Sequence, residues 1–216
     1  VPRDSRRAAL SAKHGVQRIA GIALRASQGE VAFDWPPQPR FDWLYEGSLC
    51  TAGSAMVKIG LQFSANLENL SSFKAGEDFV WYLKLKCMSC GEEGVNWHSV
   101  EADSKSACKG GPGSANLVIR CKLCSRENSL DVIPSSLVPY TADDSPSFKT
   151  IVAFDCRGVE PVAFDARDGF EAVAAESGSR FAQVKLEDNE WADYDEKAKQ
   201  TVGVYELTHR FVKLKH

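Results

Sequence analysis

Two C-x-x-C motifs place the strongest constraint on this chain. Cys87-Met88-Ser89-Cys90 is followed, after thirty residues, by Cys121-Lys122-Leu123-Cys124. Zn²⁺ accepts four thiolates in a tetrahedron with Zn–S distances near ~2.3 Å, and two intervening residues let a tight turn aim both sulfurs at one point. We therefore predict one structural Zn²⁺ held by Cys87, Cys90, Cys121 and Cys124. Because four protein ligands close the shell, the metal is not expected to be catalytic.

A redox dithiol and an iron–sulfur cluster are the alternatives for these cysteines. Thioredoxin-type dithiols lie on a βαβ unit, and the sequence has no such pattern, so zinc is favoured. The remaining three cysteines have structural interpretations. Cys50 lies in an unpatterned segment, Cys108 is interpreted as a surface thiol in the loop between the motifs, and Cys156 as a buried core residue.

Charge and hydrophobicity exclude several classes of protein. The 216 residues carry a formal net charge of −3, with a pI near 5.9, which gives no global signal for nucleic acid or anionic lipid. No apolar run approaches the roughly 20 residues that span a bilayer, and no secretory h-region is present near the start. We therefore expect a monomer without a membrane partner in the cytoplasm, where reduced thiols persist.

Residues 1–55 differ from the rest of the chain. Residues 1–29 carry a net charge of +5, a proline-rich stretch surrounds Trp35, and the segment ends in glycine and serine. Three interpretations stay open: a disordered or over-extended segment, a basic organelle transit peptide, and a folded functional arm. The first is favoured. The first methionine is Met56, where patterned sequence begins, and 1–55 is treated as an N-terminal extension.

From Met56 onward, apolar and polar residues alternate with the period of β-strands. Strands are predicted over 56–63, 79–86, 117–120, 130–133, 151–154 and 202–208. The only helical signal is weak and covers Asp193–Gln200, where a short turn is expected. The chain is therefore predicted to be mainly β and antiparallel.

An internal similarity suggests two related β units. Phe79–Cys87 resembles Phe148–Cys156 at a constant offset of 69 residues, and a glycine-containing turn follows each. We interpret this as a duplication, with chance similarity of short strands as the alternative. The predicted domains are a zinc-binding unit with a zinc ribbon-like four-cysteine site at 56–140 and a metal-free unit at 141–216. The two units are expected to intertwine.

No other motif carries a strong chemical signal. The loop Lys109–Ser114 is rich in glycine but lacks the Gly-Lys-Ser/Thr ending of a P-loop, so a hairpin loop is favoured over phosphate binding. The four histidines are scattered, and His209 is interpreted as half-buried on a strand. Residues 143–196 carry a net charge of −9, interpreted as a solvated acidic face that disfavours nucleic acid.

Several segments together resemble the eukaryotic CXXC-motif-containing zinc-binding proteins. The resemblance covers Met56 to the C-terminus and does not extend to 1–55. It is carried by the following stretches: Asn66–Leu70, Gly76–Phe79, Trp81–Lys84 leading into Cys87–Gly91, Lys109–Gly111, Cys121–Ser129, Phe148–Val152, Cys156–Gly158, Glu160–Pro161, Trp191–Glu196 and Gly203–Glu206. The resemblance implies a small, mainly β protein with two related halves and one zinc on Cys87, Cys90, Cys121 and Cys124. It supplies no substrate or reaction.

The expected function is that of a non-enzymatic zinc protein that acts through contacts with an unidentified protein partner or through metal handling. Two alternatives are kept. One is an enzyme whose site lies between the two β units, and the other is a zinc ribbon that binds nucleic acid weakly. A deep polar pocket containing His209 or carboxylates favours the enzyme, whereas a partly apolar surface favours the interaction module.

Overall fold

The computed structural model describes residues 56–109 and 113–215, which all lie in one compact unit. The described part is built of antiparallel strands, as predicted, and contains two short 3₁₀ turns, η1 (Pro134–Ser136) and η2 (Ala142–Asp144). Within these residues no helix reaches the length and apolar character needed to cross a bilayer. The predicted extension 1–55 lies outside the described residues.

The largest sheet has six strands in the order β14–β15–β1–β10–β8–β7. Their bounds are β14 (Trp191–Asp195), β15 (Gln200–Lys213), β1 (Met56–Glu68), β10 (Lys149–Arg157), β8 (Glu127–Ile133) and β7 (Leu117–Arg120). The first strand, β1, pairs with β10 on one side and with the last strand, β15, on the other. The alternation predicted for 56–63 is confirmed, because Ile59, Leu61 and Phe63 are buried on the core face.

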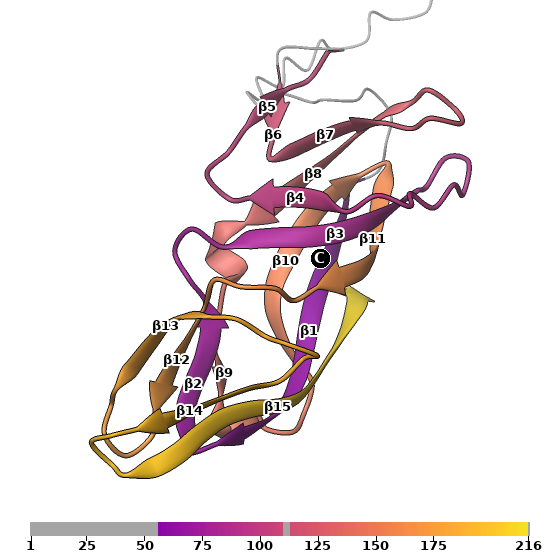
Figure 1. Ribbon diagram of the computed structural model, residues 1–216. Coiled ribbons are helices and arrows are strands. Elements are labelled where there is room, and N and C mark those ends of the chain that lie inside the picture. The colour runs from indigo at the N-terminus through magenta and orange to yellow at the C-terminus, as the bar shows by residue number, and fades with distance from the viewer. Residues whose placement is uncertain (1–55, 110–112, 216) are drawn as a thin grey trace, which may run out of the picture. The chain divides into compact units, whose positions relative to one another are not determined.

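Three smaller sheets complete the described part (Figure 1). One contains β11 (Val159–Asp165), β3 (Val80–Cys87) and β4 (His98–Glu101), in that order. The next has the order β13 (Arg180–Val184), β12 (Phe170–Ala174), β2 (Leu70–Ala75) and β9 (Tyr140–Thr141). The last is the hairpin of β5 (Ser106–Ala107) and β6 (Ser114–Ala115).

Strands from both sides of residue 140 share each of the three larger sheets. In the three-stranded sheet, for example, β11 pairs with β3, so that Val159 lies opposite Cys87. This arrangement is consistent with intertwined halves, while the boundary at residue 140 and the duplication stay predictions. The two strands that motivated the duplication, β3 and β10, lie in different sheets.

The core is aromatic where the sheets meet. Trp81 of β3 is fully buried, with its ring edge-on to Phe154 at 5.9 Å between centroids and close to Phe79 at 4.5 Å. Phe170 of β12 packs against both Phe79 and Phe73, at 4.5 and 4.7 Å. Aromatic pairs at these separations stabilise a core beyond the burial of their area.

The short turn expected over Asp193–Gln200 is present only at residues 196–199 and is not helical. Trp191–Asp195 forms β14, which pairs with β15 from Gln200 onward, and the four residues between them are a hairpin turn. Asp195 holds this turn, since its carboxylate accepts hydrogen bonds from the backbone N–H of Lys197 at 3.0 Å and of Ala198 at 3.5 Å. Pairing with a long strand therefore outweighs the weak local signal for a helical turn.

Candidate metal centre

The first knuckle begins where β3 ends. The Cys87 N–H donates to the Glu92 carbonyl at 2.8 Å, and the Gly91 N–H donates back to the Cys87 carbonyl at 2.8 Å. Gly91 has a φ of +78°, which only glycine adopts without steric cost. The Met88 N–H donates to the Gly158 carbonyl at 2.9 Å and fixes the knuckle to the turn between β10 and β11.

The second knuckle, between β7 and β8, repeats this hydrogen-bond pattern. The Cys121 N–H donates to the Arg126 carbonyl at 2.9 Å, and the Ser125 N–H donates to the Cys121 carbonyl at 3.0 Å. Ser125 takes the place of Gly91, with a φ of +58°. The equivalence of Ser125 and Gly91 could not be predicted from the sequence, because a serine does not indicate a left-handed backbone conformation as a glycine does.

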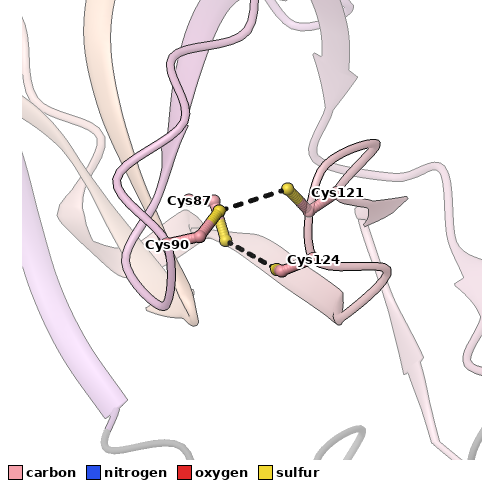
Figure 2. Close-up of side chains that lie close together, drawn as sticks. All are labelled: Cys87, Cys90, Cys121 and Cys124. Carbon is pink, nitrogen blue, oxygen red and sulfur yellow. Dashed lines mark hydrogen bonds between the residues drawn. The ribbon is translucent and has the colours of Figure 1, made fainter. Parts of the chain in front are cut away.

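The two knuckles face each other and bring the four predicted ligands together (Figure 2). The Sγ atoms of Cys87 and Cys124 lie 3.8 Å apart and those of Cys90 and Cys121 lie 3.6 Å apart. All four sulfurs lie within 4.8 Å of one another. A tetrahedron with Zn–S bonds of ~2.3 Å requires sulfurs about 3.8 Å apart, so the donor set fits one Zn²⁺. An iron–sulfur cluster needs space for several irons and sulfides, which this spacing does not leave.

Backbone N–H groups favour ionised sulfur at one cysteine of each knuckle. Burial opposes ionisation of Cys87, but hydrogen bonds from the Ser89 and Cys90 N–H groups and from the Asn128 amide lower the pKa of its thiol to about 6. The Cys124 and Leu123 N–H groups lower the pKa of Cys121 despite burial. The knuckles therefore stabilise negative charge on sulfur, as a thiolate ligand requires.

Cys90 behaves in the opposite way. The Glu92 N–H favours its thiolate, but burial and hydrogen bonds with the sulfurs of Cys121, Cys124 and Cys87 outweigh it and raise the pKa of Cys90 to about 12. Crowded thiols cannot all ionise unless a cation compensates the repulsion. This arrangement fits a bound divalent ion, which keeps all four thiolates deprotonated.

Asn128 of β8 lies next to the Cys87 ligand. This buried side chain lies with Nδ2 3.6 Å from Cys87 Sγ. In this orientation the amide oxygen faces the Gly158 and Glu127 carbonyl oxygens, and a half-turn of the amide would instead let its nitrogen donate to them at 3.0 and 3.3 Å. A zinc-bound thiolate only accepts hydrogen bonds, so a loaded centre favours donation to sulfur. Sequence reasoning missed Asn128, because an asparagine within a strand carries no metal-site pattern.

The other cysteines lie apart from this group. Cys156 is fully buried, as predicted, and burial raises the pKa of its thiol, so it is a core residue. The interpretation of Cys108 as a surface thiol is wrong, since its side chain is only 5% exposed and packs against Ala115 beneath the β5–β6 hairpin. Cys50 lies outside the described residues.

The remaining candidates do not form a catalytic group. His209 lies on a strand, as expected, but it is exposed rather than half-buried: its Nε2 accepts the Phe164 N–H at 3.4 Å, and its ring packs edge-on against Phe164 on one side. Burial on this side lowers the pKa of His209, so the ring is neutral at pH 7. Of the glycine-rich loop only its edges are described, and there the Lys109 N–H donates to the Glu127 carboxylate at 3.1 Å.

Antiparallel sheets joined at one end by two facing C-x-x-C knuckles define a mainly β protein with a structural zinc site of four cysteines. A family model described as "CXXC motif containing zinc binding protein, eukaryotic" matches residues 60–212. The chain belongs to this family, as the resemblance of its motifs indicated. The match and the thiol cluster together support a structural zinc.

Shorter relatives share this name. The chain is 54% identical to a CXXC motif containing zinc binding protein of Xenopus laevis and 51% identical to that of Homo sapiens. Each alignment covers 73% of this chain and 99% of the relative. The crystal structure of a protein designated C1orf123 superposes with a TM-score of 0.69 at 51% identity, covering 73% of this chain and 99% of the other.

Proposed function

We propose that the protein is a zinc-stabilised module for protein interaction, with Cys87, Cys90, Cys121 and Cys124 as the zinc ligands of a zinc ribbon-like site. One observation carries this proposal. A pocket of about 140 Å³ beside the centre is lined by residues of both knuckles, including Cys87 and Cys121 themselves. Because the ion joins the two knuckles, it also holds the two walls of this pocket together.

The surface around the pocket supports an interaction role. Val95 lines the pocket and is 81% exposed, and the two knuckles beside it expose Leu123 and Met88 by 67% and 52%. Scattered exposed apolar side chains are ordinary, but a group around one pocket is typical of an interaction site. By contrast, His209, on which the enzyme alternative depended, does not line this pocket and is an exposed residue beside the rings of Phe164 and Phe211. A reducing cytoplasm, in which the thiolates persist, is the compartment we propose.

A pull-down tests the interaction role. Tagged wild type is compared with Cys121→Ser, which removes one ligand, and with Cys156→Ala, which removes a cysteine outside the centre. We expect wild type and Cys156→Ala to retain the same partner and Cys121→Ser to lose it. A partner retained equally by all three proteins would remove the support for a zinc-dependent interaction surface.

Metal handling is the second candidate, and one observation favours it. Cys90 and Cys124 are exposed, whereas Cys87 and Cys121 are buried, so each knuckle offers one sulfur to solvent. An accessible sulfur allows an incoming thiol to replace a ligand stepwise. Transfer of zinc to a chromophoric chelator measures this directly: release within minutes supports metal exchange, and release over many hours supports a structural ion.

A further inference from the structure

The pocket beside the metal centre has the size of one large apolar side chain. Its apolar walls are Leu85 of β3, Val159 of β11, Ile119 of β7 and Val95 of the loop that follows the first knuckle. Its volume of about 140 Å³ compares with that of an apolar cavity of ~150 Å³ that binds benzene. A leucine, isoleucine or phenylalanine side chain therefore fits as an anchor.

One side of the pocket is basic. Arg120 and Lys122 line it and are exposed, and Arg126 follows on the same knuckle, where its Nη1 donates to Ser89 Oγ at 3.0 Å. The positive charge of Lys122 adds to burial in lowering the pKa of His98, which also lines the pocket. An anionic group entering the pocket from this side is therefore attracted.

The acidic groups nearby are Glu92, Glu93 and the thiolates of the centre. Glu92 and Glu93 lie on the opposite side of the pocket, and Glu93 is neutralised by an ion pair with Lys86 at 2.8 Å. A loaded zinc–tetrathiolate centre carries a formal charge of −2, so the attraction for an anionic group is confined to the exposed, solvent-facing side of Arg120 and Lys122. Arg120 and Lys122 thus remain available to a ligand at the pocket.

The pocket also lies between two edge strands. β4 is the edge of the three-stranded sheet and β7 is the edge of the six-stranded sheet. His98 at the start of β4 and Ile119 of β7 both line the pocket, and Figure 1 shows the two strands at the same end of the described part. An edge strand offers unpaired N–H and C=O groups to an extended segment of another protein.

We propose that this pocket binds an extended acidic segment of a partner protein. The segment inserts one large apolar side chain between β4 and β7 and places its carboxylates against Arg120 and Lys122. This inference rests on the proposed interaction role and specifies the partner's chemistry. A nucleic acid would satisfy the basic groups but would leave the apolar pocket and Leu123 unused.

A peptide-display selection tests the chemistry without a known partner. A random library of twelve-residue peptides is selected on the immobilised, zinc-loaded full chain. We expect enriched peptides to carry one leucine, isoleucine, phenylalanine or methionine flanked by aspartate or glutamate. Enrichment of basic or uncharged peptides, or no enrichment, would overturn the proposal. A zinc-dependent partner in the pull-down would leave the broader function standing in that case.

Binding of an enriched peptide to variants locates the site. Lys122→Glu reverses an exposed charge at the pocket, and Val95→Asp places a carboxylate at its apolar wall. Lys197→Glu, at the remote β14–β15 turn, is the matched control. Fluorescence anisotropy is expected to show at least roughly fivefold weaker binding for the first two variants and less than twofold for the control. Zinc content, measured in parallel, is expected to stay at one ion per chain.

Two outcomes of this second experiment would contradict the site. One is equal peptide affinity for wild type and Lys122→Glu. The other is displacement of the peptide by a twelve-nucleotide oligothymidine at equal concentration, which would indicate a nucleic-acid surface instead. Weakening of the peptide complex by salt, with no effect of the oligonucleotide, is the expected combination.

Discussion

The side-chain oxygen of Asn116 accepts a hydrogen bond from the backbone N–H of Val132 at 2.8 Å. The nitrogen of the same amide donates to the carbonyls of Ala102 and Ser104, both at 2.8 Å. Asn116 is buried, and one side chain therefore satisfies three backbone groups that belong to β8 and to the loop after β4. This amide fixes the loop that follows β4 over the end of the six-stranded sheet.

Asn116→Ala is expected to lower the free energy of unfolding by about 3 kcal/mol, because each of three backbone groups loses its partner at about 1 kcal/mol. Urea unfolding of the zinc-loaded protein, followed by tryptophan fluorescence, measures the change. Asn96→Ala, at an exposed position, is the control and is expected to change stability by less than about 0.5 kcal/mol. Equal stability of the two variants would contradict this role of Asn116.

Zinc removal is expected to destabilise the protein strongly, because the ion is the link between the two knuckles. Structural zinc contributes on the order of 10 kcal/mol in zinc-finger peptides. Chelation should lower the thermal midpoint and weaken the near-UV circular dichroism, to which Trp97, beside the first knuckle, contributes. A chelated sample with an unchanged melting curve and near-UV spectrum would show that zinc has no structural role.

Asn128→Ala is expected to release zinc roughly tenfold faster than wild type. Residues that hydrogen-bond to a metal ligand typically contribute 10- to 100-fold to metal affinity, and weaker binding is expected to appear as faster release. The change removes the donor to Cys87 Sγ but none of the four thiols. Transfer of zinc to a chromophoric chelator gives the rate. Ser129→Ala is the matched control: this neighbour is also buried, and among the described residues its hydroxyl has no hydrogen-bond partner. Equal release rates for both variants would exclude a supporting role for Asn128.

Asp195 should make the stability of the β14–β15 hairpin depend on pH. The Ser177 hydroxyl, followed by the N–H groups of Lys197 and Ala198, lowers the pKa of this carboxyl despite burial. Because the pKa of Asp195 in the folded state is lower than its pKa of about 3.9 in the unfolded state, the ionised carboxylate stabilises the folded protein fully above that pH. This stabilisation is lost as the pH falls towards the folded-state pKa.

Asp195→Asn is therefore expected to melt below wild type at pH 7, with a gap that narrows below about pH 4. Thermal melts across this range measure the gap. Both proteins lose zinc alike in acid, so the difference between them isolates the carboxylate. Glu196→Gln, at the exposed neighbour, should show no gap at either pH. A gap for Asp195→Asn that stays constant with pH would argue against ionisation as its cause.

Local sequence patterns predicted six of the fifteen described strands and the cluster of four cysteines, because both depend on short spacings. In β3, the core residues Trp81, Leu83 and Leu85 alternate with partly exposed lysines, and the strand runs directly into Cys87 as expected. The two C-x-x-C spacings likewise determined which sulfurs lie together, since each pair needs only one tight turn.

Features that depend on distant partners were not predictable in this way. Alternation shows that β1 has a core face, but it does not show that Ile59 lies opposite Phe154 on one side and Lys213 on the other. The contact of Asn128 with Cys87 and the pocket with its basic side likewise form only when the two knuckles, which belong to different sheets, come together. Cys108 was misplaced for a related reason, because the hairpin in which it contacts Ala115 is too short to give a periodic pattern.

The pairing of β1 with β15 has a consequence during synthesis. Each of the three larger sheets includes strands on the C-terminal side of residue 140. The first described strand, β1, cannot complete its pairing until the last strand, β15, has been synthesised. A nascent chain that has reached residue 140 already contains all four cysteines of the centre, so it can capture zinc while its sheets are still incomplete. Contacts this distant along the chain slow folding and prolong the exposure of apolar strands. The availability of zinc at the ribosome would then decide whether the segment up to residue 140 is held compact by the metal or exposes apolar strands that can aggregate.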